Sequence, residues 1–113
     1  GNLICSRYPI INTGEMKYQK SGNSTIWADI VCGKDTVRVY NSHLESYRLS
    51  QTDKHTINDM GKIQNVEPEK VESIVQKLAR AIQKRGVQTD ELTLSMTECP
   101  YSVISCGDFN APP

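Results

Sequence analysis

The sequence predicts an α/β or α+β domain built around a mixed β-sheet. Two runs that alternate apolar and polar residues, 24–32 and 36–44, flank a short turn containing glycine. A stretch with helical apolar spacing begins near residue 68, and a short apolar run follows at 101–106. Strands, a hairpin, a helix and a last strand in this order are typical of mixed sheets with functional loops at the strand ends.

Composition is that of an ordinary soluble globular protein rather than a disordered one. Of 113 residues, 37% are hydrophobic and 23% are charged, and thirteen basic residues balance thirteen acidic ones. No overall positive field therefore favours a nucleic-acid partner. A local basic groove that binds nucleic acid is the remaining alternative. No apolar run approaches the ~20 residues of a membrane span. The chain starts at Gly1 without a signal-like segment, and it predicts neither a cytoplasmic nor an exported location.

The first half of the chain is expected to form strands. Residues 2–5 predict a short strand, and residues 6–9 a turn before the strand-like Ile10 and Ile11, while residues 15–19 suggest an edge strand. In the hairpin, one face carries Ile26, Ala28, Ile30 and Cys32, followed on the second strand by Val37, Val39, Asn41 and His43. This apolar face becomes polar at its end, which is a plausible place for a site.

The second half is expected to form a polar excursion, two helices and a buried strand. Residues 45–65 are polar, and Pro68 suits the first turn of a helix. Gly86 is expected to end that helix, and a second short helix is expected over residues 89–96. The first helix should cover part of the apolar hairpin face with a stripe made of Val71, Ile74, Val75, Leu78 and Ile82.

The four cysteines are widely spaced, without a C-x-x-C pair, which argues against a zinc site. Free thiols are favoured, and disulfides remain the alternative. Cys5 and Cys106 lie in apolar runs and are expected to be buried.

Asp108 and Asn110 are the strongest candidates for chemistry. They belong to Gly107-Asp108-Phe109-Asn110, directly after the apolar run of the last strand. If the chain stays extended, Asp108 and Asn110 project to one side and Phe109 points into the core. A carboxylate can orient or deprotonate water or bind a hard cation, and an amide can donate to a phosphate oxygen. The alternative is that Asp108 and Asn110 only begin a turn.

His43 is the second candidate, at the end of the second hairpin strand in Asn41-Ser42-His43-Leu44. An imidazole there can donate to a phosphate oxygen or move a proton near neutral pH. A single histidine at a strand end is more often a residue without a catalytic role, so that alternative stays open.

Three segments in this order resemble the middle portion of the endonuclease/exonuclease/phosphatase superfamily, the DNase I-like hydrolases. They are Ser6–Ile10, Asn41–Leu44 and Gly107–Asn110, and Arg85 and Gln88 add the Arg-x-x-Gln spacing common in these proteins. The strand at residues 35–41 is similar to that of bacterial members.

The resemblance implies that residues 1–113 are the central portion of a four-layered α/β sandwich with a mixed sheet and helices on its outer face. It implies catalytic roles for Asp108, which would activate water or touch a metal ion, for Asn110, which would hold the phosphate, and for His43, which would contact it. Substrate contacts would come from Asn41, Arg7 and Ser6. The implied cofactor is Mg²⁺ or Mn²⁺, and the implied substrate is a phosphate ester: a nucleic acid, an inositol phosphate or a phospholipid head group.

Two elements of the superfamily are not found in the sequence. The metal-binding Glu precedes the Ser-Arg-Tyr-Pro block in these proteins, and a Ser-Asp-His segment follows Gly-Asp-Phe-Asn. Glu15 and Glu45 are wrongly placed to substitute for that Glu, and Ala111 stands where an Asp often follows. We therefore expect a fragment that is inactive alone, and that either self-associates through uncovered apolar surface or relies on the missing segments to cover it. The alternative function is a non-catalytic binding or scaffold domain with the same sheet.

Overall fold

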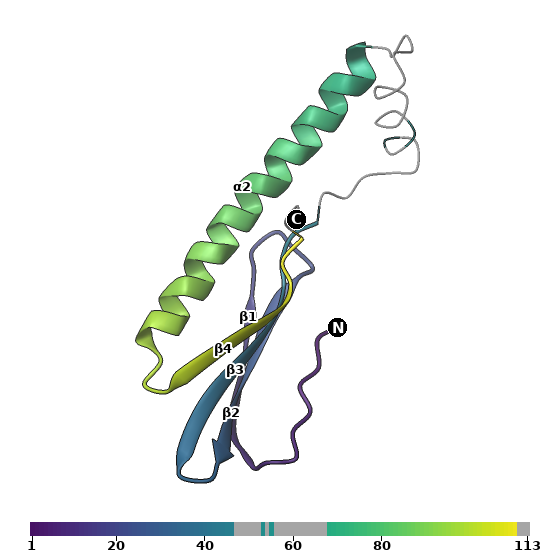
Figure 1. Ribbon diagram of the computed structural model, residues 1–113. Coiled ribbons are helices and arrows are strands. Elements are labelled where there is room, and N and C mark those ends of the chain that lie inside the picture. The colour runs from purple at the N-terminus through teal and green to yellow at the C-terminus, as the bar shows by residue number, and fades with distance from the viewer. Residues whose placement is uncertain (47–52, 54, 56–67, 111–113) are drawn as a thin grey trace.

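The computed structural model describes residues 1–46, 53, 55 and 68–110, which form a mixed sheet and a long helix (Figure 1). These elements confirm the mixed α+β class. Their bounds in chain order are β1 Ile10–Lys17, β2 Ser24–Cys32, β3 Asp35–His43, α2 Pro68–Glu98 and β4 Ser102–Asp108.

The four strands lie in the order β1-β2-β3-β4, with β3 and β4 parallel and the other pairs antiparallel. The predicted hairpin is confirmed, with β2 and β3 joined at Gly33 and Lys34. Gly33 has a φ of 64°, which suits the first central position of a two-residue hairpin turn. The expected strand at residues 2–5 is wrong, because the first strand begins only at Ile10.

The helix α2 differs from the expectation of two helices, because it runs without a break through Gly86 and residues 89–96. A glycine inside a helix costs only about 1 kcal/mol relative to alanine. Arg85 and Gln88, on either side of it, are both buried against the rest of the molecule. These contacts on both sides outweigh the local preference of Gly86 to end the helix.

The buried side of α2 also differs from the expected stripe. It is formed by Ile74, Ala81, Arg85, Gln88 and Leu92, whereas Val75 and Ile82 are each 57% exposed. Polar residues thus occupy two of the five buried positions, which hydrophobic spacing alone does not reveal.

The sheet face that receives α2 is the polar one. Tyr40 of β3 bonds Ser95 of α2, with 2.9 Å between the two hydroxyl oxygens. The expected cover of the apolar hairpin face by the helix is therefore wrong. A crossover between parallel strands such as β3 and β4 is nearly always right-handed, and this handedness rather than apolar content decides which face the helix covers.

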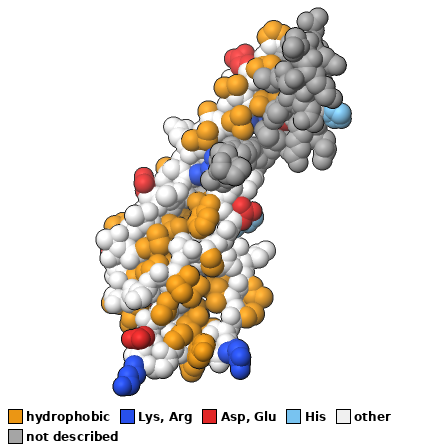
Figure 2. All heavy atoms as spheres, in the orientation of Figure 1, with side chains coloured by type: hydrophobic (Ala, Val, Ile, Leu, Met, Phe, Trp, Pro, Cys, Tyr) orange, Lys and Arg blue, Asp and Glu red, His pale blue; other side chains and the backbone are white. Residues whose placement is uncertain are grey.

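The apolar face is approached by the N-terminal segment, on the other side of the sheet from α2 (Figure 1). Asn2 Nδ2 donates to the carbonyl of Ser24 at 2.8 Å, and Asn41 Nδ2 donates to the carbonyl of Leu3 at 2.9 Å. Much apolar surface remains accessible over the sheet half of the molecule (Figure 2), including Ile104 of β4 at 54% exposed.

The four thiols are free, which agrees with the sequence-based preference for free thiols over disulfides. Cys5 and Cys106 are exposed, so their expected burial is wrong. Within the described part of the chain, no helix combines the length and hydropathy needed to cross a bilayer.

Candidate functional site

The parallel pairing of β3 and β4 brings His43 and Asp108 side by side. These two residues are partners in the register, and both strands end there. The N–H of Leu44 continues the pairing by donating to the carbonyl of Asp108 at 3.0 Å. The carboxyl ends of two parallel strands thus present an imidazole and a carboxylate together.

Gly107 allows this close approach of the two strand ends. Its φ is 138°, a conformation that other residues rarely adopt. A Cβ at this position would collide with the carbonyl oxygen of Ser42 and would lie 2.6 Å from its nitrogen. Only a residue without a side chain fits here against the backbone of Ser42 in β3.

Asn110 folds back toward the end of β3 instead of continuing the strand. Its φ is 49°, and its N–H donates to Asp108 Oδ1 at 3.0 Å, which forms a side-chain turn. Its Nδ2 donates to the carbonyl of Leu44 at 2.8 Å. Residues 108–110 therefore form the turn that was the alternative to an extended geometry, and Phe109 is 38% exposed rather than pointed into the core. The turn nevertheless brings Asn110 beside the residue that follows His43.

Two of the three proposed substrate contacts, Ser6 and Arg7, are not brought to this end of the sheet. Ser6 accepts the N–H of Tyr8 at 3.0 Å in a local turn, and Arg7 is exposed. Two residues after Arg7, the carbonyl of Pro9 accepts the N–H of Val31 at 3.0 Å. Because Val31 pairs with the start of β3, this turn lies at the end of the sheet opposite His43, about 23 Å away at ~3.3 Å per residue (Figure 1). The antiparallel direction of β1 is the physical reason for the separation.

Asn41 is two residues before His43 on β3, and the N-terminal segment holds it from both sides. Its Nδ2 donates to the carbonyl of Leu3, and its own carbonyl accepts Asn2 Nδ2 at 3.3 Å. These contacts give the side chain a structural role in anchoring that segment.

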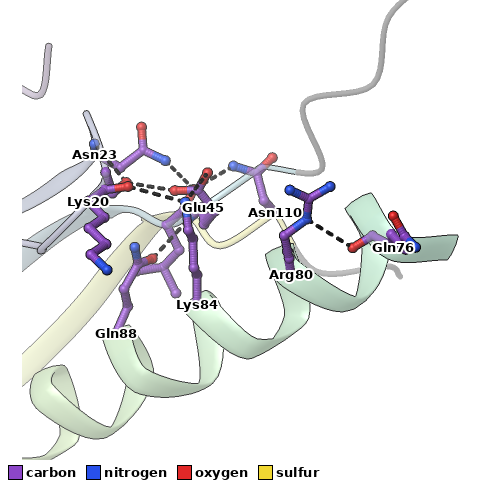
Figure 3. A network of polar contacts seen from close by, with 10 residues as sticks. Lys20, Asn23, Glu45, Gln76, Arg80, Lys84, Gln88 and Asn110 are labelled. Carbon is purple, nitrogen blue, oxygen red and sulfur yellow. Dashed lines mark hydrogen bonds and ion pairs between the residues drawn. The ribbon is translucent and has the colours of Figure 1, made fainter. Parts of the chain in front are cut away.

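A buried polar network lies directly behind the strand ends (Figure 3). Its centre is Glu45, which is 1% exposed. The carboxylate accepts the Ser21 hydroxyl at 2.6 Å and lies 4.0 Å from Lys84 Nζ. The carbonyl of Leu44 accepts Asn23 Nδ2 at 2.9 Å in addition to the amide of Asn110.

Two side chains of α2 complete the network. Gln88 Oε1 accepts the N–H of Glu45 at 2.9 Å, and a guanidinium N–H of Arg85 donates to the carbonyl of Asn110. The importance of Glu45 is missed by sequence reasoning, because a polar residue after a strand carries no sign of burial. The three-residue spacing of Arg85 and Gln88 does signal a shared helix face.

Two further polar pairs each include a residue of β2. Arg38 makes a two-pronged bond to Asp29 at 2.6 and 2.9 Å, and this carboxylate raises the pKa of the guanidinium. Burial raises the pKa of Tyr18 above its ordinary value, against the opposing effect of its hydrogen bond to Thr25. Asp29 and Arg38 lie away from His43, whereas Thr25 pairs with Ser42, the residue before His43, and its hydroxyl donates to that of Ser42 at 2.9 Å.

A magnesium ion would find a partial set of ligands at the strand ends. Among the described residues, no three His, Cys, Asp or Glu side chains lie close enough together to hold a metal. Asp108 is exposed and supplies one carboxylate, and Mg²⁺ commonly binds one or two carboxylates while keeping several waters. Asp108 therefore fits a hydrated ion, with the remaining ligands coming from water or substrate.

Two grooves in the described surface lie away from the candidate residues. One of about 300 Å³ separates Tyr18 and Lys20 from α2, and another of about 430 Å³ lies between the N-terminal segment and β1–β2. Neither is lined by His43, Asp108 or Asn110.

Comparison of the chain with protein-family models, curated proteins and solved structures finds no match. The resemblance to the DNase I-like hydrolases therefore rests on the residues and their arrangement.

Proposed function

We propose that this chain is the central part of a magnesium-dependent hydrolase of phosphate esters with a DNase I-like sandwich fold. The observation that carries the proposal is the pairing of His43 with Asp108, with Asn110 folded back beside them. His43 and Asp108 are register partners at the ends of neighbouring parallel strands, and the Asn110 amide reaches the carbonyl of the residue after His43. Ligands commonly bind at such strand ends in α/β sheets, which supports the proposal.

Each of the three side chains has a distinct part in the proposed reaction. The Asp108 carboxylate orients the attacking water and takes its proton. His43 donates to a phosphate oxygen and offsets its charge. The amide of Asn110 has two N–H groups, and while one bonds Leu44, the other can donate to the phosphate. When bound, magnesium supplies polarisation of a phosphoryl oxygen.

The second candidate function is a non-catalytic binding or scaffold domain. It is favoured by the bond between Asp108 Oδ1 and the N–H of Asn110, because a turn of this kind gives both residues a purely structural use.

Hydrolysis of bis(4-nitrophenyl) phosphate with and without magnesium separates the two candidates. The assay uses the protein that carries this chain, with any flanking sequence it has. We expect magnesium-dependent turnover that falls by several orders of magnitude in Asp108→Ala, because the group that prepares the nucleophile is removed. Asp90→Ala, at an exposed position on α2, is the matched control and should keep full turnover. Near-normal turnover in Asp108→Ala would show that Asp108 is a turn residue.

A further inference from the structure

The ends of β3 and β4 are each bonded to the same face of α2, two residues beyond a candidate catalytic residue. Gln88 bonds the N–H of Glu45, which follows His43 by two positions. Arg85 bonds the carbonyl of Asn110, which follows Asp108 by two positions. The contacts therefore have equivalent places on the two strands.

The spacing of these contacts matches the spacing of the strands. Arg85 and Gln88 are three residues apart, which is about 4.5 Å along a helix axis. Neighbouring strands lie about 4.8 Å apart. One helix face can thus reach both strand ends without distortion, and the bond from Asn110 Nδ2 to the Leu44 carbonyl joins the two ends directly.

Neither side chain is placed to touch a substrate. Arg85 is 9% exposed and Gln88 is 3% exposed. Both contact backbone atoms, and these atoms determine where the neighbouring side chains point.

We propose that Arg85 and Gln88 are positioning residues that hold the ends of β3 and β4 in one arrangement from the buried face of α2. The proposal rests on the proposed function for its effect on turnover. Loss of either contact lets one strand end shift against the other, and displacements of about 1 Å at a reacting centre cost on the order of 10²-fold in rate.

The kinetic test compares Arg85→Met and Gln88→Met with Arg80→Met and Gln83→Met in the protein that carries this chain. Arg80 and Gln83 are exposed on the same helix, and Arg80 donates to Gln76 within that helix. With bis(4-nitrophenyl) phosphate and magnesium, we expect kcat to fall roughly 10- to 100-fold in the two test variants while KM changes little. The two controls should match the wild type.

Rescue by a conservative variant separates positioning from general structural damage. Arg85→Lys keeps a cation that can still donate to the carbonyl of Asn110, so it should recover much of the lost kcat. If Arg85→Met does not fold, Arg85→Lys and Gln88→Met decide the matter, because lysine keeps the positive charge and methionine keeps the length of the glutamine side chain.

A second readout is independent of turnover. In nuclear magnetic resonance spectra, the side-chain amide of Asn110 should shift and exchange faster with solvent in Arg85→Met and Gln88→Met than in Arg80→Met. If the wild type hydrolyses nothing, the proposed function fails and this readout alone judges the positioning. Amide signals and kcat that match the controls in both test variants would overturn the proposal. A fall in kcat that only follows the folded fraction, without rescue by lysine, would overturn it as well.

Discussion

Replacing Gly107 with alanine should destabilise the protein strongly, because this residue joins an unusual backbone conformation to a close contact. Its φ of 138° is one that alanine rarely adopts. The added Cβ would lie 2.6 Å from the nitrogen of Ser42 and 2.8 Å from its carbonyl carbon. Both are backbone atoms of the neighbouring strand, so no side chain can rotate away to make room.

The size of the effect follows from these two terms. A residue held in a sparsely populated conformation costs about 1–3 kcal/mol. Overpacking that moves backbone costs about 1–3 kcal/mol more. We expect a total loss of about 2–6 kcal/mol, a large part of the ~5–15 kcal/mol that stabilises a typical domain. The strands can relieve the collision by separating, which would also part His43 from Asp108.

Urea unfolding followed by circular dichroism measures this loss, with Gly86→Ala as the matched control. A Cβ at Gly86 meets no atom within 4 Å, and the residue is inside α2. Alanine there should raise the free energy of unfolding by about 0.5–1 kcal/mol. A Gly107→Ala variant within ~0.5 kcal/mol of the wild type would refute the close contact with β3.

Three further changes test other parts of the structure. Asn110→Ala should lower kcat for magnesium-dependent hydrolysis about 10²–10³-fold, the scale for losing one transition-state donor, and unchanged kcat would contradict its role. Arg38→Met should cost about 3–5 kcal/mol in urea unfolding, because Asp29 is 2% exposed and loses its pair; a cost under ~1 kcal/mol would show the pair to be dispensable. Burial raises the pKa of Tyr18, so its stabilisation is fully present below about pH 10 and is lost as the pH rises through the folded-state pKa. The difference in unfolding free energy between the wild type and Tyr18→Phe should therefore shrink above about pH 10, and a constant difference would contradict this.

Much of the secondary structure follows from local patterns in the sequence. The alternation on either side of Gly33 predicts β2 and β3, and Pro68 marks the start of α2. These features depend on neighbours in the chain, so they are visible without the fold.

The length of α2 and the face of the sheet on which it packs depend on tertiary contacts, and they are not predicted from the sequence. Gly86 has the local signature of a helix end, yet buried contacts on both sides carry the helix through it. The helix packs on the face of Tyr40 rather than on the apolar face, because the crossover to β4 dictates its side.

In the candidate site, too, some features follow from the local sequence and others depend on tertiary contacts. The sequence marks His43 and Asp108 as polar residues at strand ends, and the structure places them side by side. The turn at Asn110 follows from its bonds to Asp108 and Leu44, and only the first of these is local. Ser6 and Arg7 lie at the other end of the sheet because strand direction is a property of the whole topology.

The polar interface under α2 has a consequence for how the helix is seated. Apolar surfaces can slide over one another at little cost, but hydrogen bonds are directional. Arg85, Gln88 and Ser95 bond three different partners over a length of about 15 Å. Sliding the helix by one turn would break all three bonds together and leave buried groups unpaired, at about 1–3 kcal/mol each. The helix is therefore held at one axial position on the sheet, and positions shifted by a turn are higher in free energy by the cost of all three lost bonds.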